Sequence, residues 1–116
     1  MEITTTPFEN VTAVAVKGRV DSTTADGLTN RLGELVKSGV SRIVIDLKEV
    51  SYISSAGFRT LLITARAVGQ ASGDMVLCGI SGEMKRLFEL SGFSELFTIL
   101  PSQDDALARL RTAGSA

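Results

Sequence analysis

The sequence predicts a single α/β domain of 116 residues. Short runs of branched apolar residues alternate along the chain with longer segments whose apolar residues recur at helical spacing. Glycines follow most of these segments, and the length allows one hydrophobic core rather than two. Because parallel strands need long crossover connections, we expect a mixed sheet of four or five strands with about four helices, mostly packed on one face.

The first half of the chain contains the best-defined predicted strands. Segment 10–18 alternates valine and alanine, which is typical of a strand, and a further strand is expected before Pro7. Residues 22–39 carry leucines at helical spacing and end at a glycine, which predicts a helix capped by a hydroxyl of residues 22–24. Residues 41–47 contain three consecutive branched residues, so we expect a central strand covered on both faces.

The following segments repeat the alternation of helix and strand. A helix is predicted from Ser55 to about residue 70, because its apolar residues follow a 3.6-residue period. Residues 74–80 predict a buried strand, and residues 81–92 predict a helix that ends at a glycine. The residues of this last helix that are predicted to face the core are Met84, Leu87 and Phe88.

The C-terminal region completes the predicted domain. A short strand is expected within residues 96–100, and a final helix is expected to start at Ser102 or Asp104. We expect the domain to span residues 1–111 and residues 112–116 to form a disordered tail.

The composition argues against several classes of function. The net charge is -1 and the basic residues are dispersed, so we expect neither nucleic-acid binding nor attraction to a membrane surface. No apolar run approaches the roughly 20 residues that cross a bilayer, and the first ten residues do not resemble a secretory signal. With a single cysteine there is no intrachain disulfide, and we expect a cytoplasmic protein.

The absence of histidine bears on catalysis. It excludes Ser-His-Asp and Cys-His chemistry and the commonest zinc ligand sets, so we expect no metal site, no cofactor and no enzymatic activity. A nucleophilic role for Cys78 is possible in principle, but a small buried core residue is the favoured interpretation.

The adjacent serines Ser54 and Ser55, followed by Ala56 and Gly57, lie between a strand and a helix. A serine at such a junction is a preferred N-cap, because its oxygen accepts a bond from an orphan backbone N–H. A phosphate would also be stabilised there by free N–H groups and the helix dipole. The two small residues would leave a hydroxyl reachable by another protein. Periodicity alone favours the cap and permits the phosphate.

Two aspartates follow predicted strands. Asp21 precedes the first predicted helix, where an Asx turn or an N-cap is the favoured interpretation. Asp46 comes at the carboxyl end of a predicted strand, where it is expected to accept bonds from backbone N–H groups of the following loop.

The order of elements and three stretches together resemble the STAS domains of bacterial anti-sigma factor antagonists. The stretches are GRVDSTTA, DLKEVSYISSAGFRTLL and LCGISGEMKRLFELSGFSELFTI, and the resemblance extends over about residues 11–110. In that family the site reads D-S-[ST]-G, and the serine two places before the glycine is phosphorylated. The resemblance therefore implies Ser55 as the acceptor. This sequence departs from that motif at two positions. Ser54 stands in place of the usual acidic residue, so either Ser54 or Ser55 could be the acceptor. Ala56 stands in place of the second hydroxyl residue of the motif.

The resemblance also implies partner switching. The unmodified protein would bind an anti-sigma serine kinase and free a sigma factor, phosphorylation would end the binding, and a metal-dependent serine phosphatase would restore it. Asp21 matches a family position near the phosphorylation site, and Arg59 is expected to point outward toward acidic groups of the kinase. Two alternatives keep the fold: a stand-alone STAS subunit of a bacterial envelope lipid-transport ATPase, and a scaffold in a stress-sensing assembly.

Overall fold

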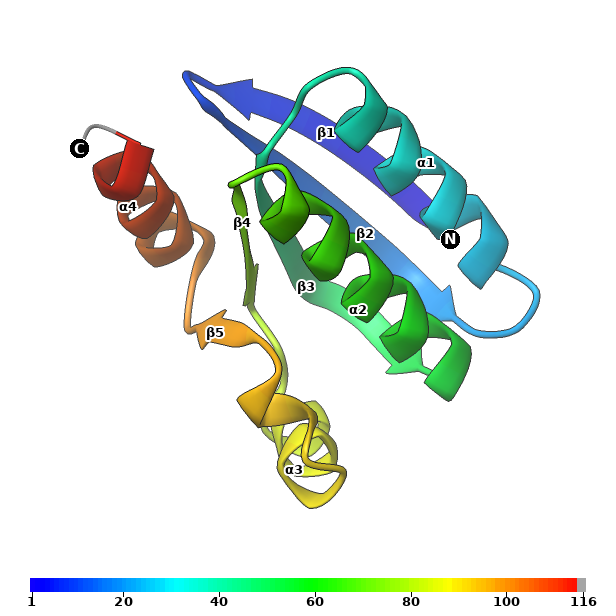
Figure 1. The fold of residues 1–116 in the computed structure, drawn as a ribbon. Helices are drawn as coiled ribbons and strands as arrows, with labels where there is room; N and C mark the ends of the chain where they lie inside the picture. The colour runs from blue at the N-terminus through cyan, green and yellow to red at the C-terminus, as the bar shows by residue number, and fades with distance from the viewer. Residues whose placement is uncertain (115–116) are drawn as a thin grey trace.

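The structure is a computed structural model that describes the backbone of residues 1–114 and the side chains of residues 1–111. It contains one five-stranded sheet in the order β1-β2-β3-β4-β5 (Figure 1). The strands are β1 (Glu2–Phe8), β2 (Val11–Val20), β3 (Arg42–Ile53), β4 (Asp74–Cys78) and β5 (Thr98–Leu100). β1 runs antiparallel to β2, and all later neighbours are parallel. The predicted mixed α/β sheet is confirmed, and β1 extends through Pro7, which an edge strand tolerates.

The helices form two layers. They are α1 (Ala25–Lys37), α2 (Ser55–Gln70), α3 (Gly82–Leu90) and α4 (Gln103–Gly114), with a short 3-10 helix η1 (Phe93–Glu95) after α3. The first three helices share one core with the sheet, and α4 packs on the opposite face. Figure 1 shows α1 and α2 side by side across the sheet and α3 beside its lower end. The expectation that most helices cover one face is therefore confirmed.

The central strands alternate between these two cores. Ile43 and Ile45 of β3 pack with α1 and α2, whereas Val44 between them packs with α4. In β4, Leu77 and Cys78 divide between the cores in the same way. Successive side chains of a strand point to opposite faces, so an unbroken apolar run fits a strand buried on both sides.

The second half of β3 was not predicted, because its sequence is largely polar. β3 continues to Ile53, six residues past the predicted end. Two register shifts in its pairing with β2 each leave one extra residue in β3. As a consequence, three apolar residues spaced three apart are all buried against the same core: Leu47, Val50 and Ile53. A regular strand with a two-residue period would turn every second one of them to the opposite face. Because of the two bulges, β3 keeps its apolar side chains toward the core as far as the start of α2.

Two local predictions need correction. Leu87 was expected in the core but is 50% exposed, because Met84 and Phe88 fill the inward side of the short α3. α4 runs to Gly114, since no residue before that glycine stops a helix, so the predicted domain end at residue 111 falls inside it. Of the predicted tail, residues 115–116 lie outside the described residues. In the described part of the chain, no helix is long and apolar enough to cross a membrane.

Candidate functional site

The ends of β2 and β3 bring two separate parts of the sequence together. Val20 and Ile53 are register partners, and the backbone N–H of Ser54 donates to the carbonyl of Val20 over 2.8 Å. The turn at Asp21 and the first turn of α2 therefore lie at the same end of neighbouring parallel strands. This end of the sheet is where the candidate site forms.

Ser54 is the N-cap of α2. Its backbone is extended (φ -88°, ψ 174°), and its Oγ accepts from the N–H of Gly57 over 3.4 Å. Ser54 is half-buried, whereas Ser55, the first residue of the helix, is exposed. The predicted hydroxyl cap of this helix is therefore confirmed, and the structure assigns it to Ser54.

Gly57 has a packing role that differs from the expected one. It is buried, and a Cβ built on it would lie 2.6 Å from Cγ1 of Ile53 and 2.8 Å from Cγ1 of Val20. The first turn of α2 thus rests directly on the ends of β2 and β3. Gly57 allows this close approach, and Ala56 beside it is half-buried.

We expect Gly57→Ala to lower the free energy of unfolding by about 1–3 kcal/mol, because the added methyl overpacks the strand ends. Gly69→Ala in the same helix is the matched control, since nothing lies within 4 Å of its Cβ position. That change is expected to stabilise the protein by up to about 1 kcal/mol through helix propensity. Urea denaturation of the two variants measures both values, and equal effects of the two changes would contradict the close packing of Gly57.

Asp21 forms the predicted Asx turn. Its Oδ1 accepts from the backbone N–H of Thr23 over 2.9 Å and from the Thr23 hydroxyl over 2.7 Å. Arg19 places Nε 3.5 Å from Oδ2 on the other side. Thr24 is the N-cap residue of α1 but makes no capping bond with its side chain. Its hydroxyl donates to the carbonyl of Arg19 instead, so the predicted hydroxyl cap of this helix is wrong.

The hydrogen bond from the Thr23 hydroxyl, followed by that from the Thr23 N–H, lowers the pKa of Asp21 from 3.8 to about 2. A lowered pKa means that the folded turn favours the ionised carboxylate. This contribution to stability is complete above pH 4 and is lost as the pH falls toward 2. Carboxyl carbon chemical shifts in an NMR titration are expected to give a midpoint near 2 for Asp21. Thr23→Ala should move this midpoint up toward 3.8.

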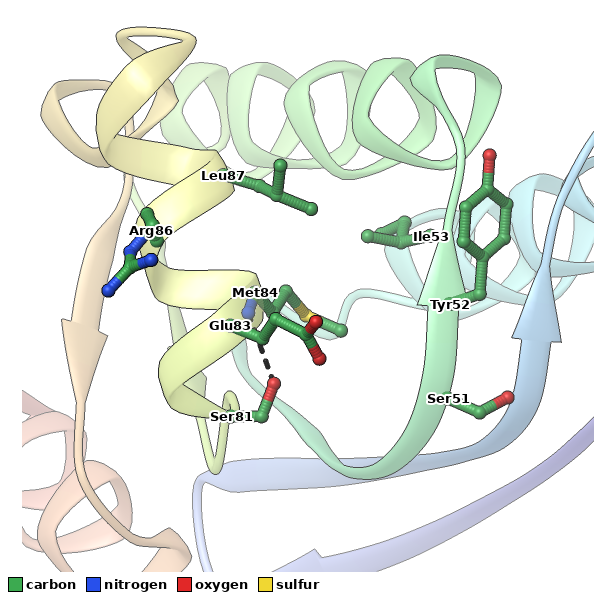
Figure 2. A pocket seen from close by; sticks show the side chains of 8 residues that line it. All are labelled: Ser51, Tyr52, Ile53, Ser81, Glu83, Met84, Arg86 and Leu87. Carbon is green, nitrogen blue, oxygen red and sulfur yellow. Dashed lines mark hydrogen bonds between the residues drawn. The ribbon is translucent and has the colours of Figure 1, made fainter.

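Beside the serines lies a groove that sequence reasoning missed. It has a volume of about 450 Å³ and is formed by the end of β3 and by α3 (Figure 2). Tyr52, which is 43% exposed, stands at its edge, and the guanidinium of Arg19 lies 4.5 Å from the centre of the tyrosine ring. Arg19 and Tyr52 are register partners across β2 and β3. This contact depends on the second bulge, which the sequence does not reveal.

The orientation of α2 is fixed by aromatic contacts. The ring of Phe58 lies 4.7 Å from the rings of both Phe88 and Phe93, centre to centre, so this side of α2 faces α3 and η1. Ser55 precedes Phe58 by three residues and therefore lies on the same side of the helix. Arg59 is exposed one turn after Ser55, as predicted.

Two predicted polar residues lie outside this site. Asp46 sits inside β3 rather than at its end, and its Oδ1 accepts from the N–H of Lys48 over 3.0 Å, which confirms a local structural role. Cys78 is fully buried, and burial, with a smaller effect from Asp46, raises the pKa of its thiol to about 12. A thiol in that state is protonated at neutral pH, which fits a core residue.

Known proteins match this chain over almost its whole length. A candidate anti-sigma factor antagonist of Bordetella bronchiseptica, BtrV, is 34% identical over 113 residues, which cover 97% of each chain. The crystal structure of an anti-sigma factor antagonist from Mycobacterium paratuberculosis has a TM-score of 0.86 and 28% identity, covering 95% of this chain and 93% of that one.

The anti-sigma factor antagonist SpoIIAA in its unphosphorylated form has the same fold, with a TM-score of 0.76 and 17% identity over 95% of this chain and 98% of its own. SpoIIAA has also been solved in a phosphorylated form, with a TM-score of 0.72 and 16% identity over 93% of this chain and 98% of that one. Residues 2–106 match the family of the STAS domain. The chain therefore belongs to the STAS domain family.

Proposed function

We propose that this protein is an anti-sigma factor antagonist that works by partner switching, and that Ser55 is its phosphorylation site. In its unmodified form it binds an anti-sigma serine kinase and so frees a sigma factor. The single observation that carries the choice of residue is the difference between the adjacent serines. The Ser55 side chain is exposed at the first position of α2, whereas Ser54 is half-buried and its oxygen caps the helix.

The surroundings of Ser55 favour a phosphate in the free protein. Within the described chain, the backbone N–H groups of Ser55 and Ala56 have no acceptor, because the capping oxygen of Ser54 is taken by Gly57. The dipole of the 16-residue α2 places partial positive charge at the same end. α2 has no acidic residue in its first turn that would repel the added charge. Phosphorylation is therefore compatible with the folded helix.

The partners follow from the same scheme. The kinase supplies ATP and magnesium, and a metal-dependent serine phosphatase removes the phosphate. Support comes from the curated and structural relatives, whose names describe anti-sigma factor antagonists, and from SpoIIAA, which exists in phosphorylated and unphosphorylated forms. Asp21 would position the site, because its turn and the Ser54 cap are joined through Val20.

The test is to incubate the purified protein with anti-sigma serine kinases from the same genome and ATP, and to map the phosphate by mass spectrometry. We expect one phosphate on Ser55, which Ser55→Ala abolishes and Ser54→Ala leaves in place. Phosphate on another residue, or undiminished labelling of Ser55→Ala, would overturn the site assignment. Co-purification with a transport ATPase and with no anti-sigma factor would overturn the proposed function itself.

Arg59 is expected to contact acidic groups of the kinase. It is exposed on the turn that follows Ser55 and forms no ion pair with another described residue. We therefore expect Arg59→Glu to weaken kinase binding at least about tenfold, measured by titration calorimetry, because like charges would face each other. Arg109→Glu is the control, since it makes the same charge change on the exposed side of α4, across the sheet. Unchanged affinity of Arg59→Glu would exclude this role.

A further inference from the structure

The groove between β3 and α3 has an apolar interior. Figure 2 shows Leu87 pointing across it toward Ile53, with the thioether of Met84 at its base. Leu87 is 50% exposed, and Leu90, one turn later on α3, is 78% exposed. Large apolar side chains left this open on a short helix are typical of surfaces that bind another protein.

The groove adjoins the proposed phosphorylation site. Ile53 in its wall is followed directly by the Ser54 cap and Ser55. Ser55 lies on the side of α2 that faces α3, because Phe58 on that side contacts the ring of Phe88. A protein segment bound in the groove between β3 and α3 would therefore lie close to the Ser55 end of α2.

The charges beside the groove indicate the chemistry of its occupant. Glu83 and Arg86 both line it, and Figure 2 shows the Glu83 carboxylate toward the groove and the Arg86 guanidinium on the other side of α3. The exposed cations on the Ser55 side belong to α2. α2 carries Arg59 and Arg66 and no acidic residue, and neither arginine pairs with another described residue. Both are exposed and lie near the Ser55 side of the helix, at spacings of four and eleven residues from it. A partner segment that crosses the exposed side of α2 is complementary to these arginines when it is acidic.

We propose that the groove receives a large apolar side chain of the anti-sigma factor, from a segment whose flanking carboxylates meet Arg59 and Arg66. This inference rests on the proposed function and adds to it the anchor of the interface. It also explains how a phosphate on Ser55 would act. The added charge would sit at the entrance to the groove, where it repels the acidic segment and must lose water for the apolar side chain to enter.

The test compares two leucines of nearly equal exposure. Leu87→Ser removes the wall of the groove, whereas Leu96→Ser changes a leucine that is 53% exposed and follows η1, outside the groove. Binding is measured by titration calorimetry with the same kinase that phosphorylates Ser55. We expect Leu87→Ser to weaken binding about tenfold or more and Leu96→Ser to change it less than about threefold. Urea midpoints of both variants check that they remain folded.

A second measurement needs no variant in the groove. In the wild-type protein with methyl-labelled methionine and leucine, addition of the kinase is expected to shift or broaden the Met84 methyl signal and to leave the Leu96 methyls unchanged. Wild-type affinity of Leu87→Ser together with an unperturbed Met84 methyl would overturn the groove as the anchor. If Ser55→Asp still blocked binding in that case, the proposed function would stand. Failure of the wild-type protein to bind any anti-sigma factor would overturn both.

Discussion

Phosphorylation of Ser55 is expected to weaken binding of the anti-sigma kinase about a thousandfold, which corresponds to about 4 kcal/mol. The phosphate adds about -1.5 to -2 charges and takes the net charge of the protein from -1 to about -3. The size of the effect comes from where the charge lies. Ser55 is exposed beside the apolar groove, so the phosphate would be enclosed in a partly dry interface and would have to lose water there.

No large conformational change is required for this loss. The Ser54 cap and the contact of Gly57 with the strand ends hold the first turn of α2 in place. Free N–H groups at that end would bind the phosphate in the unbound protein. We therefore expect the circular dichroism spectrum and the urea midpoint of the phosphorylated form to stay close to those of the unmodified form. The loss of affinity would then arise in the interface itself.

The measurement is titration calorimetry of the kinase with unmodified protein, with protein phosphorylated in vitro, and with Ser55→Asp. The aspartate variant carries one added charge, so its loss should be smaller than that of the phosphate. Ser72→Asp is the control, because it adds the same charge beyond the opposite end of α2, about 25 Å away along the helix, and aspartate tolerates its positive φ of 59°. Equal losses for Ser55→Asp and Ser72→Asp would show a general charge effect and contradict the local mechanism.

The fold class could be predicted because most elements have a clear local signal over at least part of their length. The apolar run at residues 43–45 predicts a strand buried on both faces, and this is what the two cores require. The serine before the second helix predicts a cap, and Ser54 provides it. Both predictions depend on backbone hydrogen bonds and burial within a few residues, so the sequence contains the relevant information.

The groove beside the site could not be predicted, since it depends on contacts between distant segments. β3 extends to Ile53 only because two bulges turn a polar stretch with apolar residues three apart into a half-buried strand. The contact between Arg19 and Tyr52 exists only in that shifted register. The helical period of α3 made Leu87 equivalent to its neighbours Met84 and Phe88, although the short helix buries only the latter two.

Phe88→Ala is expected to lower the free energy of unfolding by about 3–5 kcal/mol, a large part of the stability of a domain of this size. Phe88 is fully buried, and its ring makes edge contacts with Phe58 at 4.7 Å and with Phe97 at 6.1 Å between centres. Truncation would leave a cavity between α2, α3 and the segment before β5. Since the chain has no tryptophan, the unfolding curve is best followed by circular dichroism in urea.

Leu87→Ala is the matched comparison, because helical periodicity assigns Leu87 and Phe88 to the same core whereas the structure separates them. Leu87 is half exposed, so its truncation is expected to cost about 1 kcal/mol or less. The same variant should still bind the anti-sigma factor less tightly, since the side chain belongs to the wall of the groove. A large stability loss for Leu87→Ala, comparable to that of Phe88→Ala, would place this leucine in the core. The groove would then be closed. A phosphate on Ser55 would lack the apolar surroundings that account for its expected large effect on kinase binding.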